Sequence, residues 1–193
     1  MKNIKVLIIG ILCVALVIGY YMYLSSRNND DQTSGEDKRK EVVKIIEDTD
    51  LKEDYPKTPR SVVKLYNRIL TSYHNEEYTE KQFLKLGDLQ RGLLDDELLS
   101  NNERDVFFNN LRAEIKLYED RERTITSSTV SSTSDVIYKV VDKRECAYVT
   151  SSYFIKEKSS YEKTLQRYVL RKDEDGKWKI LVFYLIEGES KDD

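Results

Sequence analysis

The stretch RKDEDGKWKILVFYLIEG, from Arg171 to Gly188, has the pattern of two β-strands joined by a tight turn. β-Branched and aromatic residues precede and follow a short charged segment. Asp175 and Gly176 lie in this segment, and an Asp-Gly pair favours the positive backbone angles of a tight hairpin. The stretch therefore predicts that the domain ends in an antiparallel hairpin.

Upstream of this hairpin, the composition shifts after Arg123 towards Thr, Ser, Val, Ile and Tyr, the residues that are enriched in strands. Short polar segments divide the region into five strand-like runs. These runs are 123–131, 135–142, 145–157, 161–172 and 177–187. Five successive strands with short connections predict an antiparallel meander.

Three amphipathic helices are predicted before the strands. Thr58 and Pro59 form a helix start, Thr79 and Gln82 form a capping box, and Asn101 or Asn102 can cap the third helix. Apolar residues recur at helical spacing in each. The stripes are Val62, Val63, Tyr66, Ile69, Leu70 and Tyr73, then Phe83, Leu86 and Leu93, then Phe107, Phe108, Leu111, Ile115 and Tyr118. Helices followed by strands predict an α+β fold, with the helices on one face of a curved antiparallel sheet.

The segment from Val6 to Leu24 contains no charged residue and is long enough for a transmembrane helix. Lys2 and Lys5 precede it, which predicts a cytoplasmic N-terminus and an exported C-terminal domain. A cleavable signal peptide is the alternative, but its apolar run would be shorter and would end in small residues. Cys13 follows Leu12 rather than a small residue, so we interpret it as a packed thiol and not as a lipid-attachment site.

These features divide the chain into five parts. They are a cytoplasmic N-terminus (1–5), a transmembrane signal anchor (6–24), a polar linker (25–54), an extracytoplasmic domain (55–188) and an acidic tail (189–193). Within the linker, the segment from Lys40 to Asp48 fits either a helix or a strand.

Composition excludes several classes of function. The chain of 193 residues has a net charge of -3 and no sustained basic stripe, so nucleic acid is not an expected partner. No His or Cys cluster has the spacing of metal ligands and no cofactor motif occurs, so neither is expected. Cys146 is the only cysteine besides Cys13, and the exported domain therefore has no internal disulfide. This absence favours a Gram-positive cell envelope.

The order of the elements and the closing DGKWKI at 175–180 resemble the nuclear-transport-factor-two-like superfamily. That superfamily includes polyketide-cyclase-like proteins, scytalone dehydratase and ketosteroid isomerase. YPKTPRSVVKLYNRI (55–69), RECAYVTSSYF (144–154) and YVLRKDEDGKWKI (168–180) look like a membrane-anchored bacterial branch of it. The resemblance implies a cone-shaped domain with a pocket between the first helix and the sheet, which is either open or filled by side chains.

Candidate site residues are sought among the groups that such a pocket uses. Five residues are predicted to line it and to contact a ligand: Tyr66, Tyr73, Tyr148, Gln166 and Tyr168. No catalytic residue is predicted. His74, the only histidine, lies in a polar segment and is expected at the surface, and the Asp and Glu clusters in LLDDELL and YEDRER are expected to be solvated. A shift of one residue in strand phase would bring Glu162 or Arg167 inward.

Two classes of function stay open. A non-catalytic membrane-tethered domain that binds a ligand or an envelope protein is favoured, and a small lyase or isomerase of the polyketide-cyclase-like type is the alternative. A buried carboxylate or histidine in an open pocket would favour the enzyme. Residues from Ile180 to Ile186 are apolar on both faces of their strand, which predicts a homodimer through the open face of the sheet.

Overall fold

A computed structural model describes residues 40–186 of the chain. The predicted anchor from Val6 to Leu24, most of the linker and the acidic tail therefore lie outside the described residues. Within residues 40–186, there is no helix with the length and apolar character needed to span a bilayer. The described part is a mixed α+β domain with several helices and one antiparallel sheet, as the sequence predicts.

The first two predicted helices form where their capping signals place them. α3 (Pro59–Asn75) starts after Thr58, whose hydroxyl accepts a hydrogen bond from the Ser61 backbone N–H while Ser61 reciprocates. α4 (Glu80–Gly92) starts after Thr79 with the matching capping box to Gln82. Both boxes satisfy amides that would otherwise lack partners in the first helical turn.

The third predicted helix begins later than expected. α6 (Arg104–Asp120) has Glu103 as its N-cap, so the prediction of Asn101 or Asn102 as the cap was wrong. A short helix not predicted from the sequence, α5 (Asp96–Ser100), occupies the preceding residues. The side chains of Asn101 and Asn102 instead donate hydrogen bonds to carbonyl oxygens of α5. These two residues therefore cap the C-terminal end of α5.

The segment from Lys40 to Asp48, for which the sequence fits either a helix or a strand, is helical. α2 (Glu41–Asp48) buries Val42 and Ile45, and its first amides are satisfied from far along the chain. The carboxylate of Glu76, at the end of α3, accepts hydrogen bonds from the backbone N–H groups of Glu41 and Val42 at 3.0 and 3.1 Å. A carboxylate at a helix N-terminus is favourable for both hydrogen bonding and the helix dipole.

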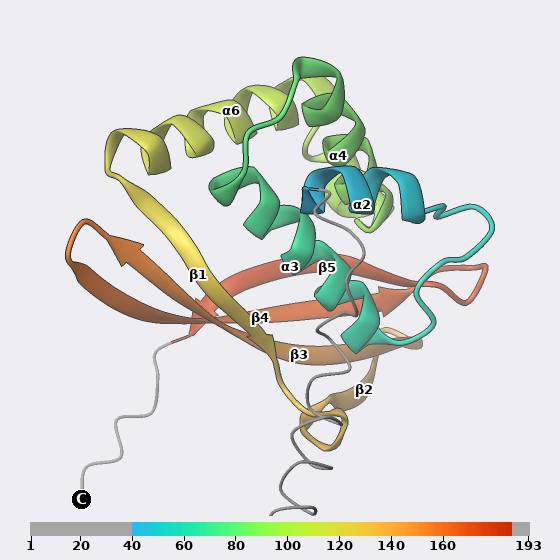
Figure 1. Cartoon of the computed structure of the whole chain (residues 1–193). Coiled ribbons are helices and arrows are strands. Elements are labelled where there is room, and N and C mark those ends of the chain that lie inside the picture. Colours follow the sequence, from blue (N-terminus) through green and yellow to red (C-terminus); the bar gives the residue numbers. More distant parts are fainter. Residues whose placement is uncertain (1–39, 187–193) are drawn as a thin grey trace, which may run out of the picture. The chain divides into compact units, whose positions relative to one another are not determined.

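The strands form one sheet, but not a simple meander. They are β1 (Arg123–Val130), β2 (Ile137–Val141), β3 (Arg144–Glu157), β4 (Ser160–Lys172) and β5 (Trp178–Ile186), in the order β1-β3-β4-β5 with β2 also paired to β3. β1 and β2 are not neighbours, because both pair with the long β3 at different positions along it. The predicted meander is therefore correct from β2 to β5 and wrong for β1 (Figure 1).

The last hairpin forms where the Asp-Gly pair predicts it. Gly176 has a φ of 76°, and Asp173 closes the turn by accepting the backbone N–H of Lys177 on its carboxylate at 2.7 Å. Gly176 is the only residue of this turn with positive φ, so the expectation of positive angles at Asp175 as well was wrong.

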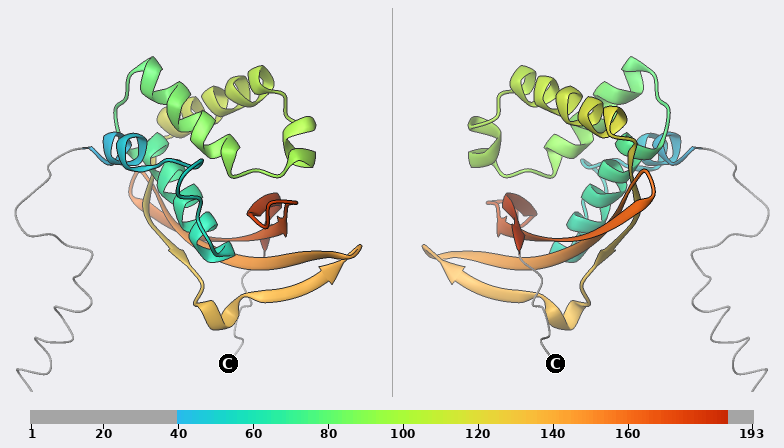
Figure 2. Two further views of the ribbon diagram at one scale, coloured as in Figure 1. Left: turned by 90° about the vertical axis from the view of Figure 1, so that its right-hand side faces the viewer. Right: turned by 90° about the vertical axis from the view of Figure 1, so that its left-hand side faces the viewer.

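The helices lie on one face of the sheet, with α3 against β1, β3 and β5 (Figures 1 and 2). The core lies between these layers and includes Val63, Ile69, Leu170 and Ile180, all fully buried. The apolar stripes of the helices thus pack against the inward-facing side chains of the strands and form one apolar layer.

β5 carries a bulge in its middle. Leu170 pairs with Ile180 and Val169 pairs with Val182, so Leu181 has no opposite residue on β4. The bulge changes the alternation of β5. Ile180 lies in the core before it, and Phe183 packs against Tyr66 and Tyr168 on the same face after it.

Candidate functional site: a cavity between the helices and the sheet

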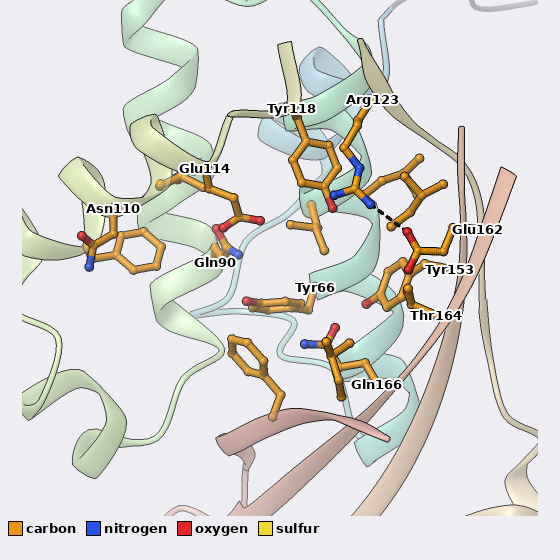
Figure 3. A pocket seen from close by; sticks show the side chains of 17 residues that line it. Tyr66, Gln90, Asn110, Glu114, Tyr118, Arg123, Tyr153, Glu162, Thr164 and Gln166 are labelled. Atoms are coloured by element: carbon orange, nitrogen blue, oxygen red, sulfur yellow. Dashed lines mark hydrogen bonds and ion pairs between the residues drawn. The ribbon is translucent and has the colours of Figure 1, made fainter. Parts of the chain in front are cut away.

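A cavity with a volume of about 510 Å³ lies between α3, α4 and α6 on one side and the sheet on the other (Figure 3). This volume falls in the range of small-molecule sites. The lining residues are Tyr66, Leu70, Gln90, Phe107, Asn110, Leu111, Glu114, Tyr118, Arg123, Ile125, Tyr153, Ile155, Glu162, Thr164, Gln166, Phe183 and Leu185. The cavity is therefore open and not filled by the side chains around it.

A buried hydrogen-bond network lies behind one wall of the cavity, to which it contributes Tyr153 and Gln166. The Tyr153 hydroxyl donates to Oδ1 of Asn67 at 2.6 Å and lies 2.5 Å from the Tyr168 hydroxyl. The Tyr168 hydroxyl in turn donates to Oε1 of Gln166 at 3.0 Å, and Nδ2 of Asn67 donates to Ser151 Oγ at 2.8 Å. Burial raises the pKa of both tyrosines, so their hydroxyls stay protonated and act as hydrogen-bond donors.

Tyr66 and Gln90 meet where α3 and α4 both reach the cavity. Burial raises the pKa of Tyr66, a side-chain hydrogen bond with Gln90 acts in the opposite direction, and the negative charge of Glu114 adds to the increase. Gln90 and Glu114 therefore both affect the pKa of the Tyr66 hydroxyl. The Gln90 residue is 2% exposed, and its Oε1 has no hydrogen-bond partner.

Charged residues stand at the other end of the cavity. Arg123, at the start of β1, donates from Nη2 to Glu162 Oε2 at 3.0 Å, and its Nε lies 3.2 Å from Glu157 Oε2 (Figure 3). The guanidinium also lies over the Tyr118 ring, 5.1 Å from its centroid. Two carboxylates thus neutralise Arg123 and hold it in place.

His74 does not lie at the surface, contrary to the prediction from its polar neighbours. Its side chain is 0% exposed and stacks on Tyr118 of α6, with ring centroids 3.9 Å apart. Nε2 lies 3.6 Å from Glu114 Oε1, beyond a hydrogen bond but within ion-pair distance. His74 is not among the lining residues, so it stands behind Tyr118 and Glu114.

The prediction that the carboxylates of LLDDELL are solvated is wrong for Asp95. Its side chain is 4% exposed and forms an ion pair with Arg171 of β4. Asp95 does not line the large cavity. Its role is structural: the Asp95 backbone N–H also bonds to the Ile180 carbonyl at 2.8 Å, so this residue attaches the loop after α4 to the sheet.

The five residues predicted to line the pocket separate into two groups. Tyr66 and Gln166 line the cavity, whereas Tyr73, Tyr148 and Tyr168 do not. The Tyr73 hydroxyl donates to the Phe83 carbonyl at 3.1 Å, so Tyr73 lies in the core between α3 and α4. Tyr148 lies under Lys139 of β2, and Tyr168 supports Gln166 from the network behind the wall.

The shift of one residue in strand phase that would bring Glu162 or Arg167 inward does not occur, since Gln166 faces the cavity as predicted and Glu162 lies on its face of β4 without a shift. Glu162 lines the cavity on the same face of β4 as Thr164 and Gln166. Arg167 lies on the opposite face, with Nη2 donating to the Thr150 hydroxyl at 3.3 Å. Strand phase therefore places a carboxylate in the cavity wall.

Gln90, Glu114, Arg123 and Tyr153 are site residues that the sequence interpretation missed. Glu114 had a usable signal, because it falls at helical spacing on the stripe that contains Leu111 and Tyr118. A charged residue within an apolar stripe indicates a polar environment inside the domain. Gln90 had the same kind of signal, because it falls at helical spacing between Leu86 and Leu93, whereas Arg123 had none.

No metal centre is apparent in the described part of the chain, since residues 40–186 contain no group of three or more His, Cys, Asp or Glu side chains arranged to hold an ion. Cys146 is buried as a free thiol. The cavity instead offers hydroxyl, amide and carboxylate groups beside apolar surface. This arrangement can bind an amphipathic small molecule.

Comparison with known proteins identifies a family but no activity. No curated protein matches the chain. A family described as "Domain of unknown function (DUF6715)" matches residues 1–183, which includes the N-terminal apolar segment together with nearly all of the domain. The chain therefore belongs to the DUF6715 family.

Proposed function

We propose that this protein is a membrane-tethered domain that binds a small amphipathic ligand without transforming it. The observation that carries the proposal is the open cavity of about 510 Å³ between the helices and the sheet, which has apolar walls and a buried hydroxyl and amide network. In our proposal the fold is of the nuclear-transport-factor-two-like type. The α3 helix packed on an antiparallel sheet, with a cavity between them, supports this assignment.

The tether is part of the same proposal. Val6 to Leu24 crosses the membrane, residues 1–5 stay in the cytoplasm, and the domain lies outside a Gram-positive cell. The uncharged apolar run and the lysines before it support this orientation.

Binding without reaction is favoured because the carboxylates of the cavity remain in contact with solvent. The Glu114 and Glu162 side chains are 49% and 60% exposed. Proton-transfer catalysis relies on a titratable group that is held away from water. The buried carboxylate, Asp95, is outside the cavity, and its pKa is lowered and not raised towards neutrality.

A lyase or isomerase is the second candidate, and one observation favours it. The buried imidazole of His74 lies 3.6 Å from the carboxylate of Glu114, which reaches the cavity. In this alternative Glu114 would contact the substrate and His74 would position it. Recovery of a bound native ligand in chemically unchanged form supports the binding function, whereas its conversion with time would support the enzyme.

A cavity-filling variant tests the binding site. Thr164 lies in the cavity wall on β4, and Thr164→Phe should occupy the space and abolish ligand binding by the full-length protein. Lys163→Phe is the matched control, because Lys163 is the exposed neighbour on the opposite face of the same strand. Equal binding by the two variants, both folded by circular dichroism, would refute the cavity as the binding site.

A further inference from the structure

The charges around the cavity are not balanced. Arg123 is already paired with Glu162 and Glu157, at 3.0 and 3.2 Å. Glu114 has no such cation: among the described residues, the only basic group within ion-pair distance of its carboxylate is His74. A cavity that contains Glu114, Glu162 and Arg123 therefore has an excess of negative charge, and this excess lies at Glu114.

A buried acceptor without a donor lies in the same cavity. The Gln90 residue is only 2% exposed, yet Oε1 makes no hydrogen bond. Most buried amide oxygens in folded proteins accept a hydrogen bond, so an N–H donor on an occupant of the cavity would supply what Oε1 of Gln90 lacks. Figure 3 shows the Gln90 and Glu114 side chains reaching into this cavity, and both act on the Tyr66 hydroxyl.

Both groups require the same chemistry from an occupant. Glu114 is an anionic acceptor and Oε1 of Gln90 is a neutral acceptor, so each is complemented by N–H donors on a cation. Apolar side chains line the remaining space, with Phe107 and Leu111 on α6 and Phe183 on β5. A flat or aliphatic body fits against such surfaces.

We propose that the cavity binds an amphipathic amine. Its ammonium group contacts Glu114 and Oε1 of Gln90, and its apolar body packs against Phe107, Leu111 and Phe183. This inference rests on the proposed binding function and specifies the ligand class for the same cavity. An amphiphile with a carboxylate head is disfavoured, because its charge would face Glu114 without a free cation in the cavity wall.

Three probes that share a ring system and differ in head group test the proposal. Naphthylmethylamine, naphthylmethanol and naphthoate are titrated into the full-length protein in lipid nanodiscs, with fluorescence anisotropy as the readout and empty nanodiscs as the blank. The amine should bind about tenfold more tightly than the alcohol, because it adds a partly exposed ion pair and a hydrogen bond. Naphthoate should bind most weakly.

Two variants assign the preference to its residues. Glu114→Gln should reduce the affinity for the amine to that for the alcohol, and Gln90→Leu should reduce it in part. Glu119→Gln is the matched control, since Glu119 is on the same helix but does not line this cavity. It should leave all three affinities unchanged.

The outcomes separate this inference from the function on which it rests. Equal binding of the three probes, or an amine preference that survives in Glu114→Gln, would refute the amine class while the binding function stands. Tighter binding of naphthoate would refute it as well. Binding of none of the probes would overturn both.

Discussion

The guanidinium of Arg171 makes two hydrogen bonds to the buried carboxylate of Asp95, with Nη2 2.5 Å from Oδ1 and Nε 3.0 Å from Oδ2. The two residues are 76 positions apart in sequence. This pair connects the loop after α4 to β4 in the sheet. Its removal tests how strongly the helical layer depends on this attachment.

Asp95→Ala should destabilise the domain by about 3 kcal/mol, because it leaves the Arg171 charge without its main partner in a partly buried site. Urea denaturation measures the loss. Asp96→Ala, at the exposed neighbouring carboxylate, should change the free energy of unfolding by less than about 1 kcal/mol. Similar losses in the two variants would contradict a structural role for the buried pair.

The same carboxylate should make stability depend on acid pH. Burial alone would raise the pKa of Asp95, but hydrogen bonds from Arg171 and from the Glu97 backbone N–H lower it to below its usual value. A lowered pKa in the folded state gives stability that is fully present above the unfolded pKa of about 4 and lost as the pH falls through the folded value. Stability curves against pH should therefore fall less steeply in acid for Asp95→Asn than for the natural protein. If the two proteins lost stability equally as the pH falls, a lowered pKa of Asp95 in the folded state would be contradicted.

Asn67→Ala should destabilise the domain by about 3 kcal/mol, since it removes from the buried network both the acceptor of the Tyr153 hydroxyl and the amide that donates to Ser151. Thermal unfolding followed by circular dichroism measures the effect. Asn110→Ala removes an amide of the same kind from an exposed position of α6 and should be nearly neutral. A neutral Asn67→Ala would mean that the network contributes little to the fold.

Gly87→Ala should destabilise the contact between α4 and α6 by about 2 kcal/mol, because a Cβ at this position would overlap the Phe108 ring. Chemical denaturation gives the magnitude. Gly92→Ala provides the comparison: its Cβ would meet only a methyl group of Leu51, at 2.7 Å, and that flexible side chain can move. We expect Gly92→Ala to lower the free energy of unfolding by less than Gly87→Ala does. The reverse order would contradict the packing described for Gly87.

The uncovered face of the sheet should mediate a homodimer. Val182 and Tyr184 are 42% and 45% exposed on β5, where apolar side chains lack cover from the helices. Tyr184→Lys should shift sedimentation of the protein towards monomer without lowering its thermal stability. Asn109→Lys, at an exposed position of α6 away from this face, serves as a control for the added positive charge. A natural protein that stays monomeric at high concentration would refute the dimer.

Protease added to intact cells should remove the exported domain and leave a membrane-bound fragment that contains Val6 to Leu24. Immunoblots against tags at the two ends distinguish the products. Recovery of the full-length chain from the cytosol would refute both the anchor and the proposed location.

Local signals predicted the helices and strands well, because capping boxes and apolar stripes act within a few residues. Tyr66 was predicted to line the cavity from its place on the α3 stripe, and it does so. The pairing of β1 with β3 was not predictable in this way, since sheet order depends on contacts between distant residues. Tyr148 was misplaced because polar and apolar residues alternate weakly along β3, which leaves the strand phase undetermined.

The two wrong predictions of exposure have the same physical origin. His74 is followed in sequence by Asn75 and two glutamates, and Asp95 by Asp96 and Glu97, but each of the two side chains is covered by a residue from a distant element. Tyr118 of α6 stacks on His74, and Arg171 of β4 pairs with Asp95. Local composition cannot show such partners, so buried polar groups are the residues that sequence interpretation is least able to find.

The bulge at Leu181 decides which side chains of β5 reach the cavity. Ile180 lies opposite Leu170 and Val182 lies opposite Val169, so Leu181 is the one extra residue between two regular stretches of the strand. A strand of the same length without the bulge would turn Val182 and Tyr184 towards the cavity and Phe183 and Leu185 to the open face, because side chains alternate along a regular strand. Deletion of Leu181 would instead leave all four side chains on their present faces. The end of β5 is therefore a place where the chain can lose one residue and keep the wall of its cavity.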